Sequence, residues 1–400
     1  MPNTPNYNEL AREFKKFSEK LSLNSKKQFS GSTPPEIFVG RKDYPKVYTG
    51  ILSPIEQGNT EQFSSPEAWF KKQASIQEIL DYRQKLIYSR FKANVKSVRD
   101  NNSTNNTNRM LSALNQIAMS HKSISAEFSL HKAPKFSVIR EPSVPLIGNP
   151  APLKSVKLEE NPKIHVKVDY TTGDEKLKAS EAIKILYKNQ IEISNIVKIL
   201  SAGLLGLKNQ RKMVPTRWAI TATDDTLSKD MLKKIKEFSE INEILVFHGE
   251  YVGNHYEIIL LPSKFEFEVI EISSKNFDKN NLGIWHDYEG FYGRKTYAED
   301  VTGAYYVNRL ALCEYLLRQK KQCSCIFFRE VKPSYTSPLG VGILRELSRA
   351  AFQRKPNEFN DLEEAFKFIS SRLKLNVSEF KSRSKVLQER KQQKTLYEFT

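Results

Sequence analysis

EILVFHGEYVGNHYEIILLPSKFEFEVIEI, residues 243–272, contains three apolar runs separated by short turn signals. The runs cover residues 243–252, 255–262 and 265–272, and each is rich in β-branched or aromatic residues. Such runs, bounded by Gly, Asn or Pro, predict β-strands. In the third run Phe and Glu alternate, which predicts a strand with one face in water. This stretch therefore predicts three consecutive strands of one sheet.

The residues just before these strands predict a helix and a further strand. RWAITAT, residues 217–223, is rich in aromatic and β-branched residues and predicts a strand. TLSKDMLKKIKEFSE, residues 226–240, has helical periodicity, and Asp224 and Asp225 before it are favourable N-caps. Strands interrupted by a helix predict an α+β fold with a mixed sheet.

Helical and extended patterns also alternate toward the N-terminus. STPPEIFVGRKDYPKVYTGILSP, residues 32–54, predicts an extended segment with turns, and SAEFSL, residues 125–130, predicts a strand. Helical periodicity is found at residues 66–98, 108–120, 175–190 and 193–203. The last two helices are separated by a short break, as in a DNA-reading helix-turn-helix. Short αα-hairpins are common, and we favour that alternative.

The pattern changes near residue 285, where one strand, residues 323–331, is surrounded by helical segments. We therefore expect a mixed-sheet N-terminal α+β domain with flanking helices and a smaller, mostly helical C-terminal domain. The expected segments are a flexible N-terminus at 1–30, an α+β domain at 31–284, a mostly helical domain at 285–391 and a tail at 392–400. Within the α+β domain we expect a mobile loop at about 99–108 and a Pro-rich segment at about 132–163 that runs extended over the surface.

Composition restricts the class of protein. The 400 residues contain 63 Lys plus Arg against 46 Asp plus Glu, a net charge of +17. This excess favours a polyanion such as DNA as partner, with general solubility as the alternative. No run of 18 apolar residues occurs, so no membrane span is expected. The N-terminus lacks an apolar signal segment, which predicts a cytoplasmic protein.

The three cysteines do not form a recognisable metal motif. Cys323 and Cys325 lie in one predicted strand, Cys313 lies in a predicted helix, and no CxxC pair occurs. We therefore expect neither a four-thiolate zinc site nor a disulfide framework. Buried small hydrophobic side chains are the favoured interpretation.

KNQRKMVPTRWAITATDD, residues 208–225, places cations before a predicted strand and two carboxylates after it. Cations at one end can hold a phosphate. Adjacent Asp224 and Asp225 can hold Mg²⁺, which prefers a few carboxylates plus water and substrate oxygens. The favoured alternative is that both aspartates only stabilise a helix start. The candidate phosphate-binding cations here are Lys208, Arg211, Lys212 and Arg217.

Two further residues at strand ends are catalytic candidates. His255 can act as an acid or base, although a hydrogen-bonded structural role is more common. Glu330 can belong to a site or simply pair with Arg329 beside it. An enzyme hypothesis combines Asp224, Asp225, His255 and Glu330 as catalytic residues of a metal-dependent nuclease or nucleotide-acting enzyme, with Arg217 and Arg294 gripping phosphate.

WHDYEGFYGRKTYAEDVTGAYYVNRL, residues 285–310, interleaves aromatic residues with Arg294, Lys295 and Arg309. Flat aromatic faces next to cations suit unpaired bases and backbone phosphate. A loop packed between domains is an equally weighted alternative. This stretch therefore adds a candidate DNA-binding surface.

The last eight residues, QKTLYEFT, carry apolar residues at a terminus with little left to pack against. One helical turn places Leu396 and Phe399 on one side, as a two-pronged apolar plug. Such a plug suits a shallow groove on another protein, and docking on its own domain is the alternative. Together with Gln393, this spacing resembles the peptide that binds the sliding clamp PCNA. The usual form ends in two aromatics, whereas Thr400 is the second position here, so altered affinity is expected.

Several long stretches resemble the archaeal Nre family of DNA repair proteins. They are VGRKDYPKVYTG, SAGLLG, RKMVPTRWAITATDD, NHYEIILLP and YEGFYGRKTYAEDVTGAYYVNR, and the resemblance runs from about residue 34 to the C-terminus. It implies a role in DNA-damage tolerance and clamp binding through Gln393, Leu396 and Phe399. Some relatives carry a cysteine-rich zinc motif near the N-terminus. This chain has no cysteine before Cys313, so no zinc site is expected.

The leading hypothesis is a DNA repair factor that is associated with the nucleoid, tethered to PCNA and in contact with DNA through basic, aromatic surfaces. The alternatives are the phosphate-handling enzyme, for which Mg²⁺ is the conceivable cofactor, and a clamp adaptor without catalysis. The resemblance implies no catalytic residue.

Overall fold

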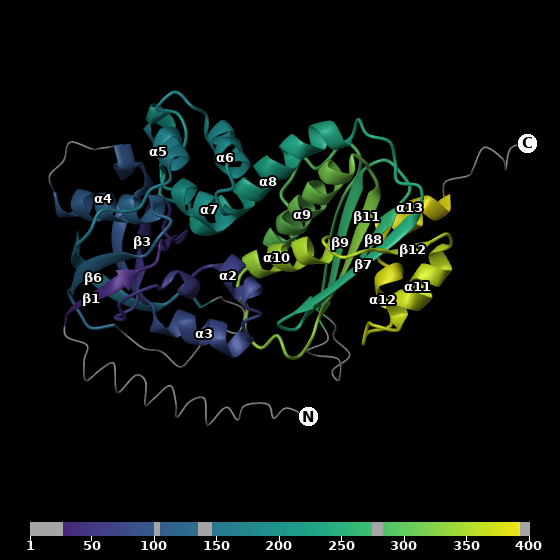
Figure 1. The fold of residues 1–400 in the computed structure, drawn as a ribbon, viewed down its shortest axis with the longest axis horizontal. Helices are drawn as coiled ribbons and strands as arrows, with labels where there is room; N and C mark the ends of the chain where they lie inside the picture. The colour runs from purple at the N-terminus through teal and green to yellow at the C-terminus, as the bar shows by residue number, and fades with distance from the viewer. Residues whose placement is uncertain (1–26, 100–104, 135–145, 274–282, 393–400) are drawn as a thin grey trace, which may run out of the picture. The chain divides into compact units, whose positions relative to one another are not determined.

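The computed structural model describes residues 27–99, 105–134, 146–273 and 283–392 (Figure 1). The fold is α+β with mixed sheets, as predicted from the sequence. Two compact units are present, and each contains its own six-stranded sheet. The described part of the first unit comprises residues 27–69, 77–99, 105–134, 146–223 and 337–339, and that of the second comprises 70–76, 224–273, 283–336 and 340–392.

The sheet of the first unit has the strand order β1-β5-β6-β4-β3-β2. The β4–β6 pair is parallel, and all other neighbours in this sheet are antiparallel. Its strands are β1 (Gln28–Thr33), β2 (Ile37–Val39), β3 (Lys46–Ser53), β4 (Ile87–Asn94), β5 (Ile124–Leu130) and β6 (Asn149–Leu158).

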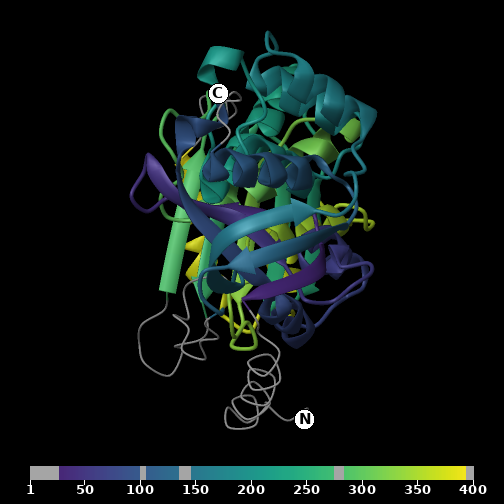
Figure 2. The same ribbon diagram turned by 90° about the vertical axis from the view of Figure 1, so that its left-hand side faces the viewer.

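Helix α4 (Asn106–Met119) lies across the sheet of the first unit and buries its apolar face against it (Figure 2). Buried side chains from α4 and the strands, among them Leu114, Ile117 and Phe128, form one continuous core. The other helical segments of this unit are α3 (Ile76–Lys85), α5 (Val166–Gly173), α6 (Ala179–Lys188), α7 (Ile193–Ser201), η1 (Glu61–Phe63), η2 (Val95–Arg99) and η3 (Lys208–Gln210). Helices α2 (Pro66–Lys71) and α8 (Thr216–Ile235), and α3 through its first residue, have residues in both units.

The sheet of the second unit has the strand order β10-β9-β11-β8-β7-β12. Here only β9 and β11 run parallel. Its strands are β7 (Ile244–Tyr251), β8 (Asn254–Leu261), β9 (Glu266–Ser273), β10 (Gly283–Glu289), β11 (Ser324–Val331) and β12 (Asn357–Phe359).

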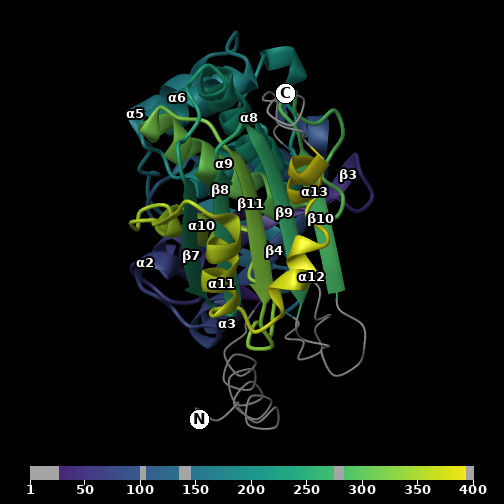
Figure 3. The same cartoon turned by 90° about the vertical axis from the view of Figure 1, so that its right-hand side faces the viewer.

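Helices cover both faces of this second sheet (Figure 3). One face packs on α11 (Leu362–Ser370), α12 (Val377–Lys381) and α13 (Lys385–Gln392), through side chains such as Phe366 and Phe380. The other face packs on α9 (Gly303–Gln319) and α10 (Gly342–Ala351). Cys313, Cys323 and Cys325 are buried free thiols in this core, as predicted. Burial raises the pKa of each thiol.

The prediction of a strand at residues 217–223 is wrong, because this segment begins the long helix α8. Asp224 and Asp225 therefore lie inside a helix and do not cap one. The buried residues of α8 form a stripe of two adjacent rows, one at Ala219, Thr223, Leu227, Met231 and Ile235 and the other at Asp224, Ser228 and Leu232. Because polar residues occupy part of this buried stripe, the apolar residues of α8 alone do not repeat with a helical period. The β-branched composition of residues 217–223 therefore predicts a strand instead.

Three other sequence predictions in the first unit also differ from the structure. Residues 87–94 do not continue the helix predicted at 66–98 but form the strand β4. In this strand, buried Phe91 and Ala93 alternate with exposed Lys92 and Asn94. Part of the predicted loop at 99–108 belongs to α4, whose N-cap is the Asn105 side chain.

The Pro-rich segment expected on the surface supplies β6, an interior strand of the first sheet. Pro150 and Pro152 are tolerated because β5 pairs only with the later residues, Leu153–Leu158. On the edge of β6 that faces β5, the missing backbone N–H groups of Pro150 and Pro152 therefore remove no hydrogen bond between strands.

The second unit differs from expectation in two ways. The prediction that one face of β9 lies in water is wrong, because Glu268 and Glu271 are buried and paired with polar groups of the protein. Residues after 284 form no separate helical lobe either, because β10, β11 and β12 pair in the same sheet as β7–β9. The central position of β11 between β8 and β9 joins both segments into one layer.

Candidate nucleic-acid interface

Two stretches that carry the family resemblance meet in the first unit. The Val95 N–H donates to the Pro45 carbonyl at 2.9 Å, and the Met213 N–H donates to the Val95 carbonyl at 2.8 Å. The Val39 N–H donates to the Thr216 hydroxyl at 2.9 Å. These bonds bring the turn before β3 next to the start of α8.

Two exposed aromatic rings contact each other at this junction. The rings of Tyr44 and Trp218 have centroids 5.5 Å apart and are inclined by 51°. Tyr44 is 40% exposed and Trp218 is 45% exposed. Large aromatic side chains usually bury most of their surface, and rings left open in pairs are typical of a binding surface.

A third exposed ring, Tyr48, lies between two cations on the neighbouring strand. Tyr48 is directly opposite Lys92 in the β3–β4 pair, and Arg90 is its diagonal neighbour. The Arg90 guanidinium carbon lies 4.5 Å from the ring centroid and the Lys92 ammonium lies 5.0 Å from it. Lys92 also pairs with Asp43 at 3.2 Å. The strand pairing fixes these cations beside the ring.

We call Tyr44, Tyr48, Arg90, Lys92 and Trp218 the basic-aromatic surface. Further cations on the same segments are exposed, namely Arg41, Lys42, Lys46, Lys212 and Arg217. Aromatic faces stack on unpaired bases, and Lys and Arg hold the phosphates between them. This arrangement can bind single-stranded or distorted nucleic acid without reading a fixed sequence.

The four predicted cations of residues 208–217 have different roles. Lys212 and Arg217 are exposed and, among the described residues, form no ion pair. Lys208 is exposed and pairs with Glu175 at 2.8 Å. Arg211 instead donates to the carbonyls of Gly206, Thr172 and Asp174 at 2.8–2.9 Å, and burial lowers its pKa. Only the exposed members remain suited to phosphate.

The predicted cations of residues 285–310 are mostly used inside the second unit. Arg309 is 1% exposed and pairs with Glu289 at 3.0 Å and with Asp225, so it does not reach an external phosphate. Arg294 pairs with Asp287 at 2.7 Å. Lys295 is exposed. Arg309 and Arg294 are therefore occupied by carboxylates of the second unit, whereas Trp285, Tyr292 and Tyr297 are at least 40% exposed.

Asp224 and Asp225, which are adjacent in sequence, each form an ion pair with a different arginine. Asp224 is fully buried and forms a bidentate ion pair with Arg345, at 3.0 and 2.8 Å. The pKa of Asp224 is raised above its ordinary value, because the effect of burial exceeds the opposing effect of Arg345. Asp225 pairs with Arg309 and with Lys229. Within the described ranges no group of three His, Cys, Asp or Glu side chains is placed to hold a metal ion.

His255 and Glu330 do come together, as register partners on β8 and β11. His255 Nε2 lies 2.7 Å from Glu257, and Nδ1 lies 3.2 Å from Glu250. Glu330 is fully buried, and one of its oxygens accepts from the Lys374 N–H at 3.0 Å. Both side chains are therefore buried and paired with other groups of the second unit.

Sequence reasoning missed most of the basic-aromatic surface. The available signal was alternation: Lys46 and Tyr48 on β3, and Arg90 and Lys92 on β4, occupy every second position of a strand. Trp218 was hidden by the wrong strand prediction at 217–223. The tail residues Gln393, Leu396 and Phe399 lie outside the described residues. In the described part of the chain, no helix combines the length and apolarity needed to cross a bilayer.

Comparisons with known proteins agree with the sequence resemblance. The family model for "Archaeal Nre, N-terminal" matches residues 5–277, and "Archaeal Nre, C-terminal" matches residues 289–399. The chain is 36% identical to the DNA repair protein NreB of Archaeoglobus fulgidus, covering 92% of this chain and 91% of that protein. It is 30% identical to the DNA repair protein NreA of Haloferax volcanii, covering 88% and 85%. No solved structure gives a significant match. The chain therefore belongs to the archaeal Nre family.

Proposed function

We propose that this protein acts in DNA repair and binds unpaired or distorted DNA through the basic-aromatic surface of its first unit. Its relatives are named DNA repair proteins. The observation that carries the DNA contact is the cluster of exposed rings and cations at the β3–β4 strands and the start of α8. Stacking on Tyr44 and Trp218 with phosphate contacts from Arg90 and Lys92 accounts for such binding.

Recruitment to the sliding clamp PCNA is the second part of the proposal. It rests on the spacing of Gln393, Leu396 and Phe399, directly after α13. This helix is fixed to the second sheet, because Glu268 accepts from the Lys385 N–H at 2.6 Å and Val386 and Leu387 are buried. A peptide attached to a fixed helix holds its partner close to the second unit. Association with the nucleoid follows from these two contacts.

A salt titration tests the DNA contact directly. Fluorescence anisotropy of a labelled oligonucleotide is measured against protein at increasing salt concentrations. We expect the logarithm of affinity to fall linearly with the logarithm of salt concentration, because each neutralised phosphate releases counterions. An affinity that salt does not change, or no binding at low salt, argues for an adaptor that contacts only proteins.

A further inference from the structure

The first unit contains a cavity of about 380 Å³ beside the N-terminal half of α7. Its wall combines the turn around η1, the end of α4, the start of α5 and the first two turns of α7. This volume lies in the range of small-molecule sites, which begins at about 300 Å³. All of its lining residues belong to the first unit, and none belongs to the basic-aromatic surface.

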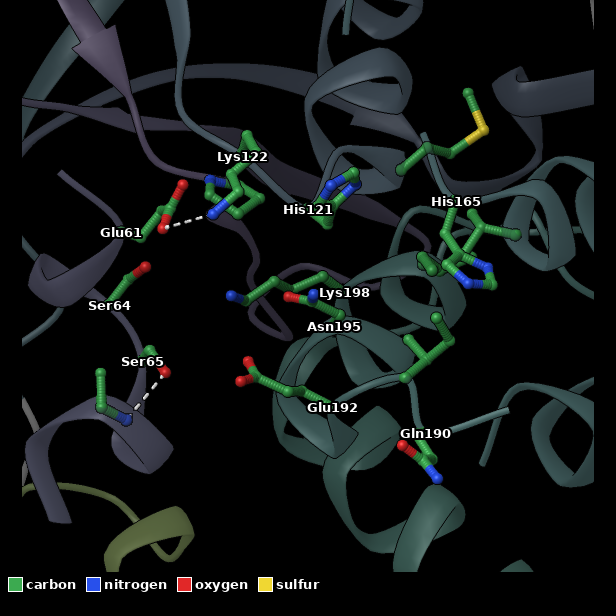
Figure 4. A pocket seen from close by; sticks show the side chains of 16 residues that line it. Glu61, Ser64, Ser65, His121, Lys122, His165, Gln190, Glu192, Asn195 and Lys198 are labelled. Atoms are coloured by element: carbon green, nitrogen blue, oxygen red, sulfur yellow. Dashed lines mark hydrogen bonds and ion pairs between the residues drawn. The ribbon is translucent and has the colours of Figure 1, made fainter. Parts of the chain in front are cut away.

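A row of three polar side chains borders the cavity. Glu192, Asn195 and Lys198 follow one another at every third position, so that they share one face of α7. Figure 4 shows their side chains extending in the same direction, toward Ser64 and Ser65. The row offers a carboxyl, an amide and an ammonium group. It therefore presents acceptors and donors in a fixed order.

This row has hydrogen-bonding capacity that the protein does not use. The Lys198 side chain is only 7% exposed, and Glu36, at 3.0 Å, is the one carboxylate within ion-pair distance among the described residues. An ammonium has three donors, so others remain open to the cavity. The Asn195 amide has no side-chain partner in the part of the chain that the structure describes. Asn195 is half-buried and Glu192 is exposed, so a ligand in the cavity can bond to these groups in place of water.

The wall next to this row is partly apolar. Met119, Val168 and Ile199 provide apolar surface, and His165 lies beside them. The Lys167 N–H donates to Nδ1 of His165 at 3.1 Å. Nδ1 is therefore the unprotonated nitrogen of the neutral ring, and Nε2–H is left as a donor. Burial, and then the neighbouring Glu67, raise the pKa of Glu192, which makes its protonated, donating form more accessible.

We propose that this cavity binds a purine or pyrimidine base, with Glu192, Asn195 and Lys198 hydrogen-bonded to its polar edge. Carboxylates accept from the amino groups of bases, Asn pairs with adenine in a bidentate manner, and Lys donates to ring carbonyls and nitrogens. The inference rests on the proposed DNA role, because a base turned out of a damaged duplex and a free nucleotide present the same edge.

The test compares the full chain with Asn195→Ala and with Asn161→Ala, an exposed asparagine outside the cavity. One arm measures binding of the nucleoside 5′-monophosphates by calorimetry. The other measures fluorescence of 2-aminopurine placed opposite an abasic site in a duplex. We expect binding in at least one arm, weakened about tenfold or more by Asn195→Ala and unchanged by Asn161→Ala. Melting curves establish that both variants are folded.

The arms identify the source of the base. A response to nucleotides alone assigns the cavity to a free nucleotide, and a response in the duplex alone assigns it to a turned-out base. Wild-type protein that binds single-stranded DNA but gives no response in either arm overturns the cavity proposal and leaves the proposed function intact. Equal affinities of wild type and Asn195→Ala in the responding arm also overturn it. If the wild-type protein binds no DNA at all, this result contradicts the proposed function instead.

Discussion

The indole of Trp218 lies 5.5 Å from the phenol ring of Tyr44, centroid to centroid, and both rings remain at least 40% exposed. The two residues come from distant parts of the sequence, and backbone hydrogen bonds through Val95 fix their segments together. An open ring pair of this kind is held without help from a ligand. Binding at such a pair, as we propose for unpaired bases, needs little rearrangement of the protein.

Removing cations beside Tyr48 should change the salt dependence of DNA binding. We expect Arg90→Gln with Lys92→Gln to weaken binding to all sequences alike and to reduce the salt slope by about 2, one for each lost phosphate contact. Anisotropy titrations at several salt concentrations provide the slope. Lys367→Gln, at an exposed position of α11, is the control. A slope equal to that of wild type would exclude these cations from the DNA contact.

The Asp224–Arg345 pair should behave as a structural element. Asp224 is fully buried and Arg345 is 3% exposed, so Arg345→Met leaves a buried carboxylate without its partner. We expect a loss of about 3–5 kcal/mol in the free energy of unfolding, measured in urea. Adding Asp224→Leu should restore much of this loss, because no buried charge then remains.

An exposed arginine gives the matched comparison for this pair. Arg383 is 33% exposed and pairs with Glu379 on the surface, so Arg383→Met should cost less than about 1 kcal/mol. If Arg345→Met is as mild as Arg383→Met, the buried pair does not stabilise the second unit, and a catalytic role for Asp224 would again need to be considered.

The stability of the second unit should depend on the charge of His255. Burial by itself lowers the pKa of His255, but hydrogen bonds to Glu257 and Glu250 raise it overall, above the ordinary 6.5. A raised folded-state pKa stabilises the fold fully below pH 6.5, and this contribution is lost as pH rises through the folded-state pKa. We expect the free energy of unfolding to decrease over that window.

His255→Gln removes the titrating group and should remove this component of the pH dependence. Urea unfolding from about pH 6 to about pH 9 compares the two proteins. His131→Gln, at an exposed position of the first unit, should retain the wild-type profile. Parallel profiles for wild type and His255→Gln would mean that His255 is not charged between the two glutamates.

The tail should carry the interaction with the clamp. Leu396→Ala with Phe399→Ala removes both apolar prongs, whose burial contributes on the order of 3–5 kcal/mol before ordering costs. We expect a pulldown with PCNA to lose the complex, whereas Lys394→Ala should retain it. Undiminished binding of the double variant would place the clamp contact elsewhere, and no binding by the wild type would point to the tail docking on its own chain.

Local patterns predicted the elements whose apolar residues repeat cleanly. The helices α4, α6 and α7 follow from their periodicity, because one face of each is apolar and buried, and the strands β7 and β8 follow from their apolar, β-branched runs. Helix α8 did not follow, since Thr223, Asp224 and Ser228 occupy buried positions. Asp224 and Ser228 bond to residues distant in sequence, Arg345 and Arg309 respectively. A local pattern contains no information on such partners.

The same limitation applies to the candidate sites. The sequence pointed to Lys212 and Arg217 near the start of α8, and these cations are exposed there. It could not show that Arg211 and Arg309, equally basic, are enclosed by carbonyls and carboxylates. The meeting of Tyr44 with Trp218 depends on strand register and on long-range backbone bonds. Side-chain type alone does not determine either one.

The most direct test of the proposed DNA surface is the affinity of a fluorescein-labelled single strand for Tyr44→Ala with Trp218→Ala. Stacking on each aromatic ring contributes about 1–3 kcal/mol, so we expect affinity to fall by at least about tenfold. Tyr170→Ala, an exposed tyrosine of α5, should bind as the wild type does. Equal affinities for the wild type, the double variant and Tyr170→Ala would contradict DNA binding at this surface.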